Sequence, residues 1–326
     1  MQTRFGTLAV IAAVEGQVGA MQLTVESALN AATSATNSAD LQYASATQEQ
    51  IDNVYYHDIA GQAAQSIHGS KLRIANEAEG PIYINYLAEE HLWPQTLRID
   101  PGMAVDYHVP VGKHVEAARF WPKYGCDEHG QNCTFGESGG PGLGCPQGGC
   151  SPPIDSKFEA TFGASDGNDW YNASQVDGWS LPFSMNFDCQ GSESQTAKLN
   201  CSGLKHSACP TQDVQGLGNV SLAALNPNKG HSYAGCYSPC SLLTHNQWKT
   251  PNRSYFSPGD EPADQYCCAG AFGGPEACWE GPNAQMTYTD VVHSHCDTYA
   301  WAYDDAVGLK ACPSENATFS ITYHEP

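Results

Sequence analysis

The sequence predicts an all-β fold, a sandwich or barrel of short strands with disulfide-rich loops beside it. Strand-length apolar or alternating runs are separated by Gly/Pro turns such as Glu79-Gly80-Pro81 and Asp100-Pro101-Gly102. The other observation is the cysteine content: all 14 cysteines lie in the part of the chain after residue 125. The chain is therefore expected to combine a β core with stapled loops.

The expected elements follow in order along the chain. Strand runs are predicted at 72–74, 82–86, 97–99, 105–109, within about 157–187, and at 319–323. Residues 126–150 are a loop rich in Gly and Cys. The segment 189–312 is dense in cysteine and has few strand signals, and Val214 to Leu225 is interpreted as one modest helix.

The N-terminal part differs in composition from the rest. Arg4 precedes the short apolar run Phe5 to Val14, and Val18-Gly19-Ala20 is a small-residue cleavage signal, so residues 1–20 are predicted to be a signal peptide. Residues 21–70 are rich in Ala, Ser and Thr and indicate a pro-segment or linker. The expected domains beyond it are a β-sandwich over 71–188 plus 310–326 and a disulfide-rich loop region over 189–309.

The charge balance limits the partners. Fourteen Lys and Arg face 35 Asp and Glu, and the net charge is −21, which repels nucleic acid and anionic membranes. Neutral polysaccharide remains compatible, and we expect a secreted monomer of the extracellular space or cell wall that does not insert into membranes. Glycosylation sequons begin at Asn132, Asn172, Asn200, Asn219, Asn252 and Asn316. The first and third contain a cysteine, so the other four are the better candidates.

The cysteines are interpreted as disulfide staples, since an even number in an oxidising compartment pairs. Each staple contributes about 2–4 kcal/mol. Cys236-x₃-Cys240 and His293-x-His295-Cys296 come nearest to zinc spacing, but neither completes a site. We expect no metal and no cofactor. Spacing alone leaves the pairing open.

Four segments carry a resemblance to a known family. They are Val176-Asp177-Gly178-Trp179-Ser180-Leu181-Pro182, Gly235-Cys236-Tyr237-Ser238-Pro239-Cys240, Tyr266-Cys267-Cys268 and Tyr299-Ala300-Trp301-Ala302-Tyr303-Asp304-Asp305. In order and spacing the chain resembles thaumatin-like proteins over about residues 72–326. The resemblance implies a flattened β-sandwich with disulfide-rich loop domains. It implies the disulfides Cys126–Cys133, Cys145–Cys150, Cys189–Cys312, Cys201–Cys296, Cys209–Cys236, Cys240–Cys267 and Cys268–Cys278.

Members of that family usually have sixteen cysteines, two more than this chain. The resemblance implies that the absent bridge is the one from the first strand to the C-terminus. Glu77 or Ala78 and Tyr323 occupy the positions of the two missing cysteines. Without that bridge, Leu72–Ile74 and Phe319–Tyr323 are predicted to be the least protected part of the sandwich in hydrogen exchange.

The resemblance also implies an acidic cleft. Its family residues correspond here to Arg119, Glu159, Asn172, Asp177 and Asp297, with Asn172 in place of an aspartate. Grouped carboxylates oppose one another's ionisation, which allows one to act as an acid and another as a base or nucleophile, as glycoside hydrolysis requires. Glu159 is the expected general acid. Asp177 or Asp297 is its expected partner.

The remaining two cleft residues are expected to bind substrate. Arg119 would hold a neighbouring carboxylate, and the amide of Asn172 would bind sugar hydroxyls. Asp304-Asp305 is interpreted as a solvated loop pair, and His293 and His295 are interpreted as loop residues and not as ligands.

Two functions remain open. The first is binding of β-1,3-glucan or a similar cell-wall polysaccharide, with or without weak endo-β-1,3-glucanase activity. The alternative is a non-catalytic carbohydrate-binding or antifungal defence protein, or a protein inhibitor. The amide at Asn172 is the feature that separates them, since an amide is neither an acid nor a base.

Overall fold

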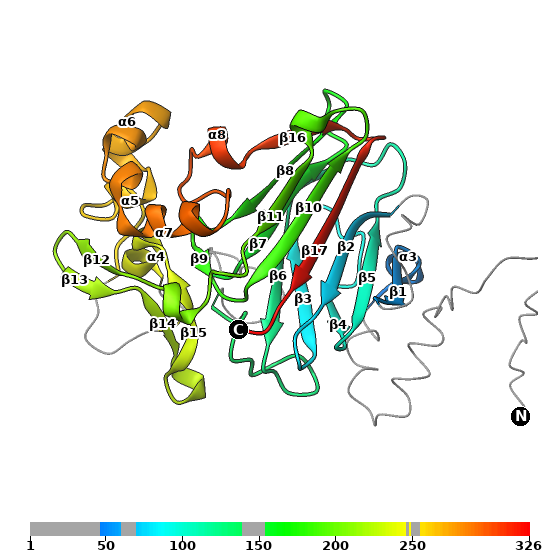
Figure 1. The fold of residues 1–326 in the computed structure, drawn as a ribbon, viewed down its shortest axis with the longest axis horizontal. Coiled ribbons are helices and arrows are strands. Elements are labelled where there is room, and N and C mark those ends of the chain that lie inside the picture. Colours follow the sequence, from blue (N-terminus) through cyan, green and yellow to red (C-terminus); the bar gives the residue numbers. More distant parts are fainter. Residues whose placement is uncertain (1–45, 60–69, 139–153, 246–247, 249–254) are drawn as a thin grey trace, which may run out of the picture.

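A computed structural model describes residues 46–59, 70–138, 154–245, 248 and 255–326. Two six-stranded sheets form the sandwich within these residues (Figure 1). In spatial order the first sheet contains β1 (Val54–Asp58), β5 (Met103–His108), β2 (Ser70–Asn76), β17 (Ala317–Tyr323), β10 (Phe183–Cys189) and β11 (Ala197–Asn200). The second contains β16 (Lys310–Pro313), β8 (Asn168–Ser174), β7 (Lys157–Phe162), β6 (Val115–Tyr124), β3 (Ile82–Leu87) and β4 (Thr96–Ile99).

Shorter elements make up the rest of the described chain. Two small sheets contain β12 (Thr211–Val214), β13 (Gly218–Ser221), β14 (Ala223–Asn226), β15 (Ser232–Tyr237) and β9 (Gly178–Trp179). The α-helices are α3 (Gln48–Asp52), α4 (Pro239–Thr244), α5 (Asp264–Cys267), α6 (Pro275–Glu280), α7 (Thr287–His295) and α8 (Asp305–Gly308). The 3₁₀ helices are η1 (Glu193–Gln195), η2 (His206–Ala208), η3 (Pro227–Lys229), η4 (Gly270–Phe272) and η5 (Asn283–Gln285).

Aromatic side chains fill the space between the two sheets. Burial alternates along β17, as expected for a strand with one face in the core. The rings of Phe319 on β17 and Phe158 on β7 lie 5.4 Å apart between their centroids. Those of Tyr107 on β5 and Phe120 on β6 lie 5.2 Å apart. These contacts cross from one sheet to the other, so the predicted all-β sandwich is the observed fold.

The first sheet extends beyond the predicted sandwich at both edges. The sequence predicts a linker over 21–70, whereas residues 48–52 form α3 and residues 54–58 form β1, which pairs with β5. The opposite edge strand, β11, lies in the predicted loop region and pairs with β10. Both strands are short, five and four residues, so little periodicity marks them in the sequence. The predicted signal peptide, 1–20, lies outside the described residues.

The prediction of a helix at Val214–Leu225 is wrong, because the segment forms strands. This segment forms the end of β12, all of β13 and the start of β14. Gly216 and Gly218 have φ angles of 82° and 71°, which glycine adopts readily in a tight turn. The two glycines therefore reverse the chain where a helix would continue.

Six of the seven expected disulfides are present, and Cys145–Cys150 lies outside the described residues. The observed pairs are Cys126–Cys133, Cys189–Cys312, Cys201–Cys296, Cys209–Cys236, Cys240–Cys267 and Cys268–Cys278. Cys189 ends β10 and Cys312 lies in β16, so this pair joins the two sheets. The other long-range pairs lie in or at the border of the segment 201–308, which we call the loop-rich region.

Polar contacts hold the C-terminus where the absent bridge is expected. The Glu77 amide donates to the Tyr323 carbonyl at 2.9 Å. The Glu325 carboxylate accepts from the Tyr124 hydroxyl and the Glu79 amide, both at 2.9 Å. Moreover, β17 is an inner strand between β2 and β10. We therefore expect slow exchange at Leu72–Ile74 and Phe319–Tyr323, the opposite of the expectation from the sequence.

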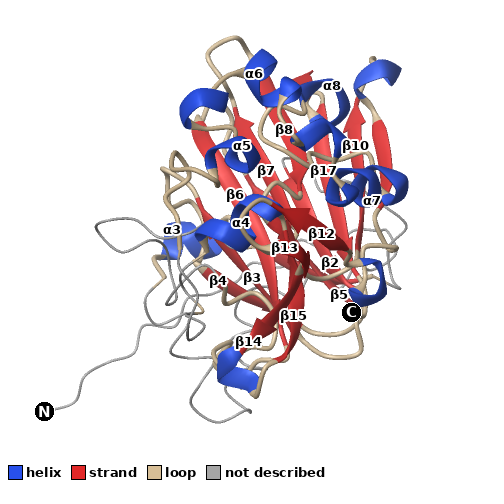
Figure 2. Cartoon of the chain, turned by 90° about the vertical axis from the view of Figure 1, so that its left-hand side faces the viewer, coloured by secondary structure: helices blue, strands red, loops and turns tan. Residues whose placement is uncertain are grey.

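The loop-rich region lies on one side of the sandwich. Figure 1 shows α4 to α7 and β12 to β15 grouped at the left, next to the second sheet. Figure 2 views the molecule from that side and shows these elements in front of the sandwich. The segment that connects β8 to β9 passes between the two parts, and it carries Asp177.

Candidate functional site

Three of the expected site residues form a row across adjacent strands. Arg119 on β6 pairs in register with Glu159 on β7, and Glu159 pairs with Asn172 on β8. Directly opposed residues project from the same face of a sheet. Their neighbour Phe158 is buried in the core, so this row lies on the outward face. Sheet register therefore brings these three side chains together.

An ion pair fixes part of the row. Arg119 Nε lies 3.1 Å from Glu159 Oε1, and the two side chains are 45% and 27% exposed. The Oδ1 atom of Asn172 is buried and has no hydrogen-bond partner among the described residues. A buried carbonyl oxygen without a partner is costly unless a donor reaches it.

The second carboxylate, Asp177, is held by a lysine that the sequence interpretation missed. Lys157 Nζ lies 2.8 Å from Asp177 Oδ2, with side-chain exposures of 1% and 21%. Lys157 and Glu159 are two residues apart on β7 and so project from the same face. The lysine therefore ties Asp177 to the strand and face that carry Glu159. The sequence did contain a signal for this: Lys157 is a charged residue in a mostly apolar strand, and it lies two residues before Glu159, on the same side of the strand.

Glycine shapes the turn that follows Asp177. Gly178 has a φ of 140°, and a Cβ there would lie 2.1 Å from the Cys236 carbonyl oxygen. The carbonyl of Asp177 accepts from the Ser238 amide at 3.1 Å. The Asp-Gly pair thus lets the backbone approach β15 closely, which sets the position of Asp177.

The last expected carboxylate, Asp297, is exposed and lies in a loop that docks on β8. Tyr299, two residues further on, donates its amide to the Ala173 carbonyl at 3.1 Å, and its carbonyl accepts from the Gln175 amide at 2.8 Å. Among the described residues, no hydrogen bond or ion pair joins Asp297 to Arg119, Glu159 or Asp177. The structure thus places Asp297 near the end of β8 but not in the ion-paired group.

Tyr299 itself belongs to the surroundings of Glu159. Burial raises the pKa of the Tyr299 hydroxyl, as do its hydrogen bond to Asp305 and the nearby Glu159 carboxylate. The hydroxyl donates to Asp305 Oδ1 at 2.6 Å. Tyr299 therefore remains a neutral donor at physiological pH.

Asp304 is not the solvated loop residue that the sequence predicts. Its side chain is 4% exposed and lies 2.7 Å from His293 Nε2. It also accepts from the Ala300 amide at 3.0 Å. The hydrogen bond to Asp304 raises the pKa of His293 above its ordinary value. This ion pair holds the loop that contains Asp297 against helix α7.

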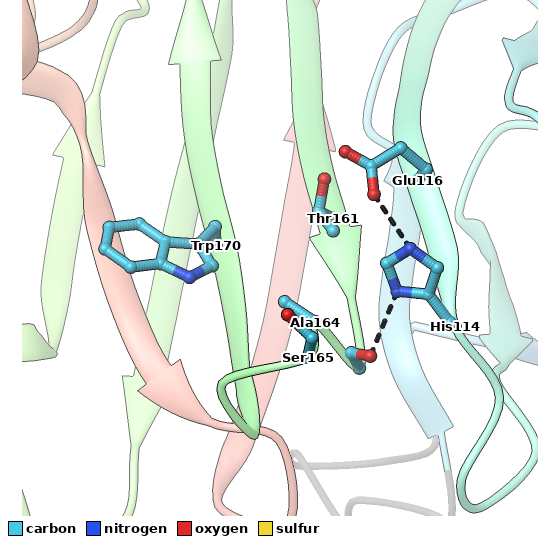
Figure 3. Close-up of a pocket in the computed structure, with 7 residues that line it drawn as sticks. His114, Glu116, Thr161, Ala164, Ser165 and Trp170 are labelled. Atoms are coloured by element: carbon cyan, nitrogen blue, oxygen red, sulfur yellow. Dashed lines mark hydrogen bonds and ion pairs between the residues drawn. The ribbon is translucent and has the colours of Figure 1, made fainter.

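A shallow depression continues the same outward face. It has a volume of about 530 Å³ and is lined by His114, Glu116, Thr161, Gly163, Ala164, Ser165 and Trp170 (Figure 3). Thr161 and Trp170 pair in register on β7 and β8, two residues from Glu159 and Asn172. The depression therefore adjoins the row.

The candidate glycosylation asparagines differ in exposure. Asn219 is exposed at the start of β13, and Asn316 is half-buried in a turn before β17. Asn172 lies within a sheet with its Oδ1 buried, which leaves little room for a glycan. Asn252 lies outside the described residues.

The described residues contain neither a cluster of metal-ligating side chains nor a helix suited to a membrane. No group of three or more His, Cys, Asp or Glu side chains there is placed to hold a metal ion. In that same part of the chain, no helix has the length and apolarity needed to cross a membrane.

The fold and site together define a disulfide-stapled β-sandwich with an acidic, ion-paired surface beside a loop-rich region. The sequence model described as "Thaumatin family" matches residues 76–325, and the chain belongs to this family.

Curated relatives are 25–30% identical to this chain over the aligned residues. A "Thaumatin-like protein" from Arabidopsis thaliana is 30% identical over 212 residues, 64% of this chain and 71% of the relative. A "Glucan endo-1,3-beta-glucosidase" from Prunus avium is 26% identical over 209 residues, 63% of this chain and 70% of the relative. A solved laminaripentaose-producing β-1,3-glucanase in complex with laminaritetraose has 14% identity and a TM-score of 0.49, covering 78% of this chain and 98% of that one.

Proposed function

We propose that this protein is secreted and binds β-1,3-glucan, or a similar cell-wall polysaccharide, through Arg119, Glu159, Asn172 and Asp177. The observation that carries the proposal is the in-register row of Arg119, Glu159 and Asn172 on one outward sheet face. Such a row presents a cation and a carboxylate to one ligand, with the half-buried amide side chain of Asn172 beside them. These groups suit a ligand with many hydroxyl donors and acceptors and no charge of its own.

Several features support the details of this proposal. The relative from Prunus avium is named a glucan endo-1,3-beta-glucosidase, which favours a β-1,3-glucan ligand. No cysteine is free among the described residues, and disulfides persist in oxidising compartments. The predicted signal peptide and the exposed sequon at Asn219 agree with export. The net charge of −21 favours a neutral glycan over an anionic one.

Endo-β-1,3-glucanase activity is the second candidate. It is favoured by Glu159 and Asp177, two carboxylates that Lys157 ties to one strand face. Glu159 would protonate the glycosidic oxygen, and Asp177 would act on the opposite side of the sugar as base or nucleophile. Asn172 weighs toward binding alone, because an amide there offers hydrogen bonds without proton transfer.

The test is co-sedimentation of the purified protein with insoluble β-1,3-glucan, with cellulose as the comparison polymer. Glu159→Gln removes one hydrogen-bonded charge, and we expect its affinity to fall about tenfold. Glu315→Gln, an exposed carboxylate before β17, is the matched control and should bind normally. Failure of the unaltered protein to sediment with β-1,3-glucan would refute the proposal.

The same samples separate the two candidates. Release of oligosaccharides by the unaltered protein, and not by Glu159→Gln, would establish catalysis with Glu159 as an essential residue. Glucan that is bound yet stays intact through a long incubation would establish a non-catalytic binding protein.

A further inference from the structure

Trp170 is a large, exposed aromatic side chain on the outward face of the second sheet. It is 39% exposed, although most tryptophans of the described chain lie in the core. Its Nε1–H donates to Asp166 Oδ2 at 3.0 Å, a contact that fixes the orientation of the indole. A fixed, exposed indole is a preformed apolar surface with a polar edge.

The wall opposite Trp170 is built by an irregular part of β6. The pairing of β6 with β7 shifts between Val115 and Ala118, and Ala117 has a φ of 49°. A bulge of this kind turns a side chain away from the regular alternation. As a result Glu116 and Ala117 are both exposed, and Glu116 lies at the rim of the depression.

Polar groups line the space between these walls. His114 Nε2 lies 2.8 Å from Glu116 Oε2, and His114 Nδ1 lies 3.0 Å from the Gly163 carbonyl oxygen. The Thr161 hydroxyl accepts from the Ala117 amide at 3.2 Å and keeps its own proton for another acceptor. Figure 3 shows Thr161 between Trp170 on one side and the His114–Glu116 pair on the other.

The depression and the proposed glucan site form one continuous surface. Thr161 and Trp170 lie two residues from Glu159 and Asn172 on the same two strands. Two residues of a strand span roughly 6.6 Å, which is comparable to the size of one sugar ring. A glucan chain that runs along β7 and β8 from the row of Arg119, Glu159 and Asn172 would therefore reach Trp170.

We propose that Trp170, with Thr161 and Glu116, forms an additional subsite for a neutral hexose ring of the glucan. The apolar face of the sugar would stack on the indole, and its hydroxyls would bind the threonine hydroxyl and the glutamate carboxylate. This inference rests on the proposed function, because it extends the same ligand. It has a specific consequence: long oligosaccharides, which reach both the row and Trp170, should bind more tightly than short ones.

The experiment compares laminarihexaose with laminaribiose by isothermal titration calorimetry on the purified protein. Trp170→Ala should weaken binding of the hexaose about tenfold, which is the size of one aromatic stack, and leave the disaccharide unaffected. Trp170→Phe keeps a stacking ring and should retain most of the affinity. Trp279→Ala is the matched control, since Trp279 is 59% exposed in the loop-rich region. It should change neither affinity.

The outcomes separate this inference from the function on which it rests. If the unaltered protein binds neither sugar, both fail. If it binds and Trp170→Ala keeps the hexaose affinity within twofold, or lowers both affinities equally, the subsite alone is refuted. If Trp170→Ala does not fold, NMR of the unaltered protein provides the test. The indole N–H resonance of Trp170 should shift when laminarihexaose is added and stay unchanged with laminaribiose. A resonance that does not shift with the hexaose would refute the subsite.

Discussion

The sandwich and the loop-rich region are stabilised by different means. The sandwich buries large aromatic side chains between two sheets, including Trp93, Phe120 and Phe158, each with less than 2% of its surface exposed. The loop-rich region has helices of four to nine residues. Helices so short are unstable alone. Disulfides such as Cys209–Cys236 and Cys240–Cys267 compensate there.

The difference matters because the candidate site lies where the two parts meet. Arg119 and Glu159 come from regular strands of the sandwich. Asp177 lies in the turn that leads to β9, and β9 pairs with β15 of the loop-rich region. The stacked rings of Trp179 and Tyr288, 5.4 Å apart, bring helix α7 to this turn. Arg119 and Glu159 therefore depend on the packing of the sandwich, whereas Asp177 also depends on the ring stacking and the Cys209–Cys236 disulfide that hold β15 and α7 in place.

The largest expected effects come from removing one staple of the loop-rich region or one core ring of the sandwich. In the Cys240→Ala/Cys267→Ala variant, the loss of a staple with a sequence separation of 27 should lower its free energy of unfolding by about 3–4 kcal/mol. Hydrogen exchange followed by mass spectrometry should show faster exchange at 205–295, with the strands of the sandwich unchanged.

Phe158→Ala provides the reciprocal test. This change creates a cavity between the sheets and should cost about 3–5 kcal/mol in the sandwich. If either variant accelerates exchange equally in both parts, the chain unfolds as one cooperative unit and the distinction between the two regions is wrong.

The same division explains how far the sequence could predict the molecule. Strand alternation depends on local pattern, so most sandwich strands were predictable, whereas the short strands β1, in the predicted linker, and β11, in the predicted loop region, were not. The row of Arg119, Glu159 and Asn172 followed from a family resemblance. Its in-register geometry depends on sheet pairing, which a sequence does not display.

Long-range polar partners were beyond prediction. In the sequence, Lys157 is only a charged residue in a strand, and nothing there pairs it with Asp177, twenty positions away. Asp304 looks like a loop residue until the fold brings His293 to it. In both cases the burial of the charged group is a property of the tertiary structure, because solvent is excluded by segments remote in sequence.

The next effect concerns the ion pair that joins the two parts. Lys157→Met removes the cation and leaves Asp177 partly buried without it, which should cost about 2–3 kcal/mol and displace the carboxylate. Chemical denaturation measures the stability, and co-sedimentation with β-1,3-glucan should show weaker binding.

A double variant separates charge from packing. Lys157→Met combined with Asp177→Asn leaves no uncompensated charge, so it should be more stable than Lys157→Met alone. Equal stabilities of the two variants would mean that Lys157 acts through its aliphatic stem, and the pair would not be an electrostatic link between the regions.

The smallest effect is a pH dependence confined to the loop-rich region. Because Asp304 raises the pKa of His293, the stabilisation by this pair is complete below the unfolded pKa of about 6.5. It is lost as pH rises through the higher folded pKa. The pair is partly exposed, so we expect a contribution of about 0.5–1 kcal/mol.

Histidine resonances followed by NMR, together with exchange at 296–305 above and below neutral pH, measure this effect. His293→Gln keeps a hydrogen-bond donor that does not titrate, so its exchange at 296–305 should not change across this range. Asp297 also raises the pKa of His293, so Asp297→Asn should lower it slightly. A His293 that titrates at or below 6.5 in the unaltered protein would show that the Asp304 contact does not hold this loop. The exposed Asp297 would then be positioned only by Tyr299 and the Cys201–Cys296 staple.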